Sequence, residues 1–186
     1  MKKIILISGK ANHGKDALAE YLKEQLENQG SKVAVDRFAK YIKSYLKSYY
    51  GWNGVDKDEF IRTKLQQLGT ERIKDELNYK SFHAKRLAED FQIVSEDFDY
   101  FLVPDTRFRD EIYTMKAMFP DDCIAIRVNR YDFKSPLTEE QLKHRSECDL
   151  DKFKFDHTLH TRKTDITQLY DEADKFLNKL MEGEFK

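Results

Sequence analysis

The chain alternates short apolar runs with longer segments in which apolar residues recur at helical spacing. The apolar runs are rich in β-branched or aromatic residues, which predicts strands at residues 3–7, 32–36, 100–103, 123–128 and 155–159. The periodic segments predict helices at residues 15–30, 39–52, 56–77 with an interruption near Gly69, 81–94, 109–119 and 165–181, and a charged helix and loop after Pro136. Strands that alternate with helices indicate a parallel sheet covered on both faces. We therefore predict an α/β fold of three layers, a parallel, five-stranded sheet flanked by helices.

The length and the charge of the chain limit the number of domains and the possible partners. The 186 residues fit a single domain, residues 1–186, and the 33 basic residues nearly cancel the 34 acidic ones. No global positive field is therefore available to hold nucleic acid. Two cysteines, Cys123 and Cys148, make no disulfide framework, and the apolar run that follows the first lysines is too short for a signal peptide. We expect a cytoplasmic protein with no membrane partner.

The first predicted strand leads into a glycine-rich loop that matches the G-x-x-x-x-G-K pattern of a phosphate-binding loop. Its glycines let the backbone curl so that successive N–H groups point inward, and the following helix adds the positive end of its dipole. Lys15 would supply a full charge to the transferred phosphoryl group. The residues expected to hold ATP are Gly9, Lys10, Ala11, Asn12, His13, Gly14, Lys15, Asp16 and Ala17.

Two carboxylates are candidates for binding Mg²⁺. Asp16 stands where this loop usually has Ser or Thr, and it would ligate the ion directly or through water. The alternative is that Asp16 is only a favourable acid in the first turn of a helix. Asp105 follows an apolar strand, as a Walker B acid does, and could orient the shell of ligands around the Mg²⁺ ion.

Arginines gather at the ends of other predicted strands, where ligands of parallel sheets bind. Arg37 follows the second strand, and Arg107 and Arg109 follow the third. The last two lie two residues apart, so we expect them to share a side in extended backbone. Because guanidinium groups match phosphate geometry, this second group predicts a second phosphorylated ligand that accepts a phosphoryl group.

Four stretches, with the closing segment, carry a resemblance to a known family. They are SGKANHGKDALAEYL, Arg37-Phe38-Ala39 with the Lys/Tyr-rich helix after it, LQQLGTERIK and VPDTRFRDE, and the closing segment is FDHTLHTRKTDITQLYDEADKFL. Together they resemble the deoxynucleoside monophosphate kinases of phages and bacteria, a branch of the P-loop nucleoside monophosphate kinases. Arg109-Asp110 replaces the family's Pro-Asn, and Lys74 stands where an Arg often occurs.

The resemblance implies a P-loop kinase fold and transfer of the γ-phosphoryl group of ATP, with Mg²⁺, to a deoxynucleoside 5′-monophosphate. It implies catalytic roles for Lys15 and Arg107, and also for Arg130 and Arg145, which it places in a lid-like segment of about residues 130–150. The candidate acceptor-site residues are Arg37, Gln66, Thr70, Asp105, Arg107 and Arg109.

Other interpretations stay open. The Gly-Lys-Asp loop also resembles animal-type phosphomevalonate kinase, so the acceptor could be another small phosphorylated molecule. A regulatory protein that binds nucleotide without transferring phosphate is a further alternative. Residues 39–52 mix Lys with Tyr, as a nucleic-acid surface would. Tyr41, Ile42, Tyr45, Leu46 and Tyr49 fall at core spacing, however, which favours packing or a wall of the acceptor pocket. The base, the sugar and the formation of a homodimer are not determined by the sequence.

Overall fold

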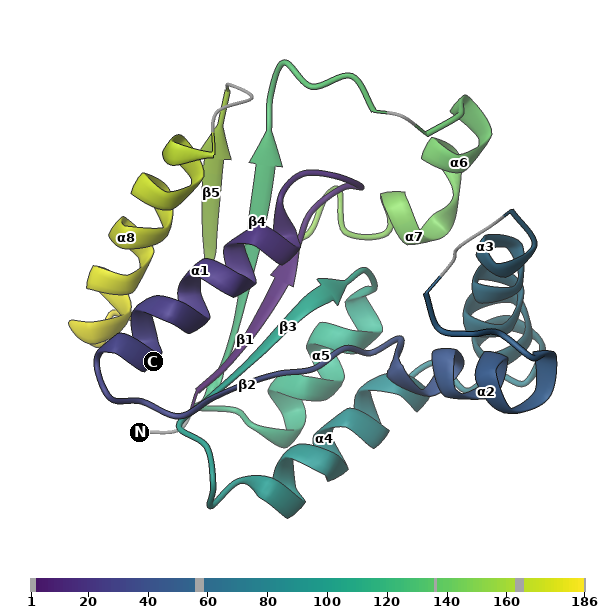
Figure 1. Cartoon of the computed structure of the whole chain (residues 1–186), viewed down its shortest axis with the longest axis horizontal. Helices are drawn as coiled ribbons and strands as arrows, with labels where there is room; N and C mark the ends of the chain where they lie inside the picture. The colour runs from purple at the N-terminus through teal and green to yellow at the C-terminus, as the bar shows by residue number, and fades with distance from the viewer. Residues whose placement is uncertain (1–2, 56–58, 136, 163–165, 186) are drawn as a thin grey trace.

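A parallel sheet forms the centre of the molecule. The computed structural model describes residues 3–55, 59–135, 137–162 and 166–185. All neighbouring strands of the sheet run parallel, in the order β2-β3-β1-β4-β5 (Figure 1). The strands are β1 (Lys3–Ser8), β2 (Val33–Val35), β3 (Tyr100–Thr106), β4 (Cys123–Arg130) and β5 (His157–Thr161). The predicted α/β class and the five parallel strands are confirmed.

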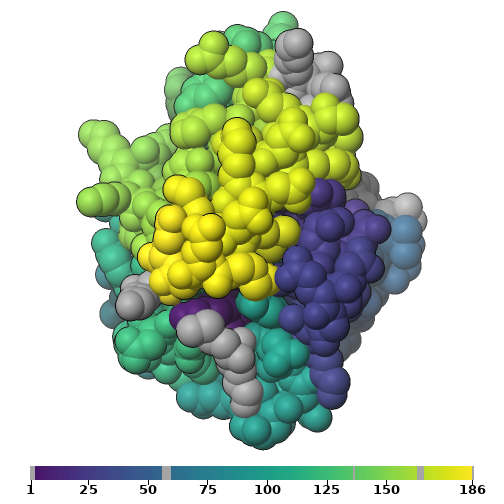
Figure 2. All heavy atoms as spheres, turned by 90° about the vertical axis from the view of Figure 1, so that its left-hand side faces the viewer, coloured from purple at the N-terminus to yellow at the C-terminus, as the bar shows by residue number. Residues whose placement is uncertain are grey.

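Helices cover both faces of the sheet because its strands are apolar on both sides. Along β1, Ile5 and Ile7 belong to the core under α1 (Lys15–Asn28) and α8 (Thr167–Met181). Their neighbours Ile4 and Leu6 belong to the opposite core, under α4 (Phe82–Val94) and α5 (Arg109–Met118). Figure 2 shows α8 lying beside α1 on the outer surface of the layer that these two helices form. No helix within the described ranges combines the length and the apolar character needed to cross a membrane.

Two further groups of helices lie at the carboxyl ends of the strands. The first is a lobe beside the sheet, made of α2 (Lys40–Tyr50), α3 (Glu59–Gln66) and the π-helix η1 (Gln67–Glu76) (Figure 1). It has a small core of its own, built from Leu46, Trp52 and Ile61. The second comprises α6 (Glu139–Lys143) and α7 (Arg145–Cys148), in the long connection from β4 to β5. Both groups therefore lie at the edge of the sheet where the ligands of parallel sheets bind.

Four strands extend beyond their predicted ends: β1 to Ser8, β3 to Thr106, β4 to Arg130 and β5 to Thr161. β3 does not end at Pro104 but continues to Thr106, which pairs with Ser8 after a shift of register along β1. Proline is tolerated in a strand at such an irregularity, because one ladder hydrogen bond is already lost there. β4 likewise continues to Arg130, where it pairs with Thr161 of β5.

The interruption predicted near Gly69 is wrong. The helix continues from α3 into η1 with wider turns, and the first residues of the predicted segment, 56–58, lie outside the described residues. A Cβ on Gly69 would lie 2.5 Å from Cδ1 of Ile42 in α2. Gly69 therefore allows two helices of the lobe to approach closely, and it does not break one of them.

The tyrosines of α2 do not share its buried face. Ile42 and Leu46 are buried, but Tyr49 is 78% exposed and Tyr45 is only half-buried. The prediction that these tyrosines pack with the two aliphatic residues is wrong for Tyr49. A helix turns about 100° per residue, so the row of tyrosines is rotated from the row at Ile42 and Leu46 and is less buried than that row.

Candidate functional site

The loop between β1 and α1 has the geometry that phosphate binding requires. Gly14 lies in the left-handed region, with φ of 96°, at the N-cap of α1. Gly9 has φ of 156°, and a Cβ there would lie 2.8 Å from the carbonyl oxygen of Val128. Both positions therefore need glycine, one for the turn into the helix and one for close contact with β4.

Lys15 is folded back over this loop. Its buried Nζ donates hydrogen bonds to the carbonyl oxygens of Gly9 and Lys10, both at 2.9 Å. Burial, followed by the charge of Arg107, lowers the pKa of Lys15 to about 8. A phosphate group beside Nζ would favour the charged form, so the loop holds a cation that is poised for an anion.

A cavity of about 740 Å³ opens beside the loop, between the ends of β2 and β3 and the helical lobe. The predicted site residues that line it are Ala11, Asn12, Lys15, Asp16, Arg37, Gln66, Thr70, Asp105 and Arg107. The structure thus brings the predicted ATP loop and most of the predicted acceptor site into one space. That volume is sufficient for ligands of nucleotide size.

Other predicted residues are adjacent to the cavity without lining it. Gly9, Gly14 and Ala17 belong to the loop and α1 but are not part of the cavity wall. Nζ of Lys10 pairs with Asp151 at 2.8 Å. His13 accepts the N–H of Arg130 at Nδ1, at 3.2 Å, which holds its ring against the end of β4.

The arginines of the predicted second group do not all converge. The extended backbone expected at Arg107 and Arg109 is corrected, because β3 ends at Thr106 and α5 begins at Arg109. Arg107 lines the cavity and contacts Ser146 and Glu147, whereas Nε of Arg109 donates to the carbonyl oxygen of Asp149 at 2.9 Å. Both guanidinium groups thus contact residues 146–149, but of the two only Arg107 reaches the cavity wall.

The two arginines of the lid-like segment also lie outside the cavity wall. Nη1 of Arg145 pairs with Asp75 at 2.9 Å, which joins α7 to η1. Nη1 of Arg130 donates to the carbonyl oxygen of Asn12 at 3.2 Å, beside the phosphate loop.

The two candidate metal ligands have different surroundings. Asp16 lines the cavity with a largely exposed carboxylate, whose Oδ1 lies 2.5 Å from Nη2 of Arg37. Asp105 accepts the N–H of Phe38 at 2.9 Å and the N–H of Ala39 at 3.0 Å, one on each carboxylate oxygen. Burial raises its pKa, and these two donors oppose that effect. Asp105 thus fixes the turn into α2, and Asp16 is the more accessible oxygen donor.

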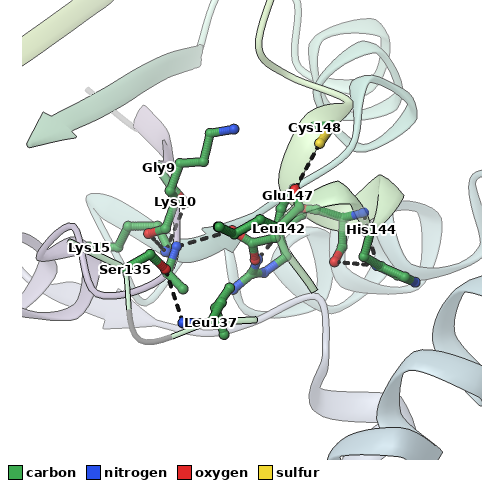
Figure 3. A network of polar contacts seen from close by, with 12 residues as sticks. Gly9, Lys10, Lys15, Ser135, Leu137, Leu142, His144, Glu147 and Cys148 are labelled. Atoms are coloured by element: carbon green, nitrogen blue, oxygen red, sulfur yellow. Dashed lines mark hydrogen bonds and ion pairs between the residues drawn. The ribbon is translucent and has the colours of Figure 1, made fainter. Parts of the chain in front are cut away.

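Glu147 in α7 is a site residue that the sequence analysis missed. Its Oε2 accepts the N–H of Ala11 in the phosphate loop at 3.1 Å, and its Oε1 pairs with Nη1 of Arg107. Only 7% of the Glu147 side chain is exposed. Figure 3 shows Glu147 facing the loop at Gly9, Lys10 and Lys15. A carboxylate of the protein therefore lies between the phosphate loop and an arginine of the predicted acceptor site.

The cavity is also lined by other residues that the sequence analysis missed as site residues. Phe38, Ile42 and Phe108 form apolar walls, and His83 and Glu111 are buried polar residues. Oε2 of Glu111 accepts the N–H of Arg107 at 2.8 Å and the N–H of Phe108 at 3.0 Å. Burial raises the pKa of Glu111 to about 7. The carboxylate thus orients the backbone that carries Arg107.

Among the described residues, no group of three or more His, Cys, Asp or Glu side chains is placed to hold a metal ion. A magnesium site in this cavity would therefore rest on one or two carboxylates together with phosphate oxygens. Mg²⁺ is often held in this way, with several waters retained. The donor set of Asp16, with Asp105 behind it, fits such an ion.

Comparison with solved structures identifies the fold. The chain aligns with a sugar kinase from Janibacter sp. HTCC2649, with a TM-score of 0.55 and 12% identity over 96% of this chain and 95% of that chain. It also aligns with the APS kinase of Mycobacterium tuberculosis in complex with AMPPNP and APS, with a TM-score of 0.54 and 11% identity over 97% and 98%. For the shikimate kinase of Bacteroides thetaiotaomicron the TM-score is 0.54 and the identity 14%, over 96% and 98%.

No protein-family model and no curated protein sequence matches the chain. At identities this low the structural similarity establishes the fold and does not establish the reaction. The chain has the α/β fold of the P-loop kinases, with a five-stranded parallel sheet flanked by helices.

Proposed function

We propose that this protein transfers the γ-phosphoryl group of ATP to a nucleoside or deoxynucleoside 5′-monophosphate and forms the diphosphate. The observation that carries the proposal is a single cavity lined by Lys15 of the phosphate loop and by Arg37 and Arg107. These arginines follow two other strands, β2 and β3. A nucleotide-binding protein that transfers nothing has no need of this second cationic group at the same cavity.

The reaction would be a direct in-line transfer. One oxygen of the acceptor phosphate attacks the γ-phosphorus, the bond to the bridging oxygen breaks, and that oxygen leaves on ADP. Lys15 would neutralise charge on the transferred group, and Arg107 and Arg37 would hold the acceptor phosphate. The attacking oxygen is already ionised at neutral pH, so no protein group has to remove a proton.

Asp16 is the residue that we expect to hold Mg²⁺, directly or through water. The ion, when bound, would neutralise negative charge on the phosphates. Asp16→Ala should therefore raise the Mg²⁺ concentration needed for half-maximal rate, as measured in a metal titration of turnover. A variant with unchanged metal dependence would remove Asp16 from this role.

The test is an assay of ADP release with ATP and Mg²⁺, run against the four deoxynucleoside monophosphates, the matching ribonucleotides and phosphomevalonate. We expect one or more mononucleotides to accelerate ADP release well above the rate with ATP alone. No acceleration by any mononucleotide, in a protein that still binds ATP, would refute the proposal. Acceleration by phosphomevalonate alone would assign the kinase to a different acceptor.

A pair of arginine variants localises the acceptor phosphate. Arg37→Ala should raise the KM for the mononucleotide by about tenfold or more, because a charge-assisted hydrogen bond to phosphate is lost. Arg72→Ala is the matched control, since Arg72 is an exposed residue of η1 that pairs with Glu76 and does not line the cavity. Equal effects of the two substitutions would count against the assignment of Arg37.

A further inference from the structure

His83 lines the cavity and has a buried ring nitrogen without a hydrogen-bond partner among the described residues. The residue as a whole is 3% exposed. Its Nε2 lies 3.4 Å from the carbonyl oxygen of Gly69, whereas its Nδ1 is buried and has no hydrogen-bond partner among the described residues. A buried polar atom without a partner is costly, so its presence at a cavity wall calls for an explanation.

The protonation state of His83 follows from its surroundings. Burial, assisted by the charge of Lys74, lowers the pKa of His83 to about 4, so the ring is neutral at physiological pH. A carbonyl oxygen can only accept a hydrogen bond, so the contact with Gly69 places the ring proton on Nε2. Nδ1 is then a lone pair that can accept a hydrogen bond but cannot donate one.

The groups around His83 form a recognition floor, defined here as His83, Lys74 and Glu111. Lys74 is fully buried, with Nζ at 3.6 Å from Oε1 of Glu111 and 3.9 Å from the centre of the Phe108 ring. The lysine and the carboxylate offset each other's charge. Lys15, Arg37 and Arg107 also line the cavity, with the carboxylates of Asp16, Asp105 and Glu147 beside them.

These two groups of residues suit different parts of a ligand. A phosphate group would bind beside Lys15, Arg37 and Arg107, and the neutral His83 suits an uncharged polar group. Phe38 and Phe108, which are 2% and 6% exposed, add apolar wall to the cavity. A nucleoside monophosphate has this arrangement of parts, with an anion at one end and a flat base with polar edges at the other.

We infer that the recognition floor reads the base of the acceptor, and that Nδ1 of His83 accepts a hydrogen bond from an N–H group on the base edge. This rests on the proposed function for the identity of the acceptor as a mononucleotide. Lys74 is a positioning residue, because its charge keeps the His83 ring neutral and its Nζ faces the carboxylate of Glu111. A base that presents no N–H at this point leaves Nδ1 unpaired and is discriminated against.

Substitution of His83 tests the inference. His83→Leu removes the acceptor atom, and His83→Asn keeps a polar amide close to the position of Nδ1. His157→Leu is the matched control, because His157 is a half-buried histidine that packs against the ring of Phe176 and does not line the cavity. Binding of each mononucleotide is measured by calorimetry, and kcat and KM are measured with saturating ATP.

We expect His83→Leu to weaken binding of the preferred mononucleotide by about tenfold, the equivalent of one buried hydrogen bond, and to reduce the preference among bases. His83→Asn should recover part of that preference. Affinity for AMPPNP should be unchanged in both variants, and His157→Leu should behave as the wild type.

The outcomes separate the inference from the proposed function. A His83→Leu protein with unchanged base preference and affinity overturns the inference and leaves the kinase proposal standing. Mononucleotide binding that depends on His83, in a protein without turnover, supports the inference and refutes the kinase. Loss of AMPPNP binding together with acceptor binding shows a purely structural role for His83 and overturns the inference.

A measurement on the unaltered protein avoids any effect of substitution on folding. In ¹⁵N-labelled wild-type protein, the Nδ1 resonance of His83 should shift when the preferred mononucleotide saturates the cavity, because a hydrogen bond then forms at that atom. A resonance that does not move at saturation overturns the inference.

Discussion

At the scale of single residues, the positive charge of Lys15 lowers the free energy of unfolding when no ligand is bound. Lys15 has an ordinary pKa of 10.5 and a folded-state pKa of about 8, so folding opposes its protonation. The resulting destabilisation is fully present below pH 8, and it disappears as the pH rises through the unfolded value near 10.5. By linkage this shift corresponds to at most about 3 kcal/mol, and bound phosphate would recover it.

Lys15→Met should therefore separate stability from activity. We expect kcat to fall by about 10² or more, because a preorganised charge is lost from the transferred phosphoryl group. The unliganded variant should unfold at the same or a higher temperature than the wild type near pH 7, as calorimetry would measure. Lys175→Met is the control, since its exposed ammonium pairs with Glu172 in α8 and does not line the cavity. Near-normal turnover in folded Lys15→Met would contradict the assignment of the loop.

At the scale of elements, α7 acts on the phosphate loop through one carboxylate. Glu147 accepts the N–H of Ala11 and pairs with Arg107, so it links the two cationic parts of the cavity. An incoming phosphate would compete with this carboxylate for the same donors. We therefore expect α6 and α7, the short helices between β4 and β5, to move when substrates bind.

Glu147→Gln should tighten binding of AMPPNP by about threefold to tenfold, because the neutral amide competes less strongly for Arg107 and repels phosphate less. Titration calorimetry in the absence of acceptor measures this change. Glu140→Gln, in the exposed α6, removes the same charge without the contact and should have no effect. Weaker AMPPNP binding by Glu147→Gln would show that the carboxylate supports the loop and does not compete with phosphate.

At the scale of the whole molecule, the cavity joins two packed units. The sheet with its flanking helices has two large cores, and the lobe of α2, α3 and η1 has a separate small core. A mononucleotide that bridges Arg107 at the sheet and Thr70 in the lobe would draw the two together. Closure of this kind excludes water from the reacting phosphates.

The single tryptophan reports on this closure. Trp52 is 8% exposed and packs in the small core of the lobe. We expect its fluorescence to change when the acceptor mononucleotide binds and to change much less with AMPPNP alone, because the phosphate loop belongs to the other unit. Trp52→Phe should abolish the signal. An equal response to AMPPNP alone would show that the lobe does not respond selectively to the acceptor.

Some features of the fold could be predicted from sequence patterns, and others could not. Strands and helices follow from local periodicity, so the class of fold and the loop from Gly9 to Lys15 were predictable. The ends of β3 and β4 were not, because they depend on pairing with distant strands. Gly69 was misinterpreted as a break, since only the approach of Ile42 reveals its role.

Some residues of the candidate site could likewise be predicted from the sequence, and others could not. Arg37 and Arg107 could be placed at strand ends from the sequence, and both line the cavity. Glu147 carries no local signal, because a glutamate in a charged segment is usually solvated. His83 is no easier to find, because it lies at a buried position of an amphipathic helix, where a histidine is usually part of the core.

The sequence by itself determined the elements, the parallel sheet and the phosphate loop, because glycine conformations and apolar spacing act over a few residues. Only the tertiary structure decided which charges meet. Contacts such as Glu147 with Ala11, or Lys74 with Glu111, join residues far apart in the chain. Their burial, and therefore their electrostatic effect, exists only when the helices have packed over the carboxyl ends of the strands.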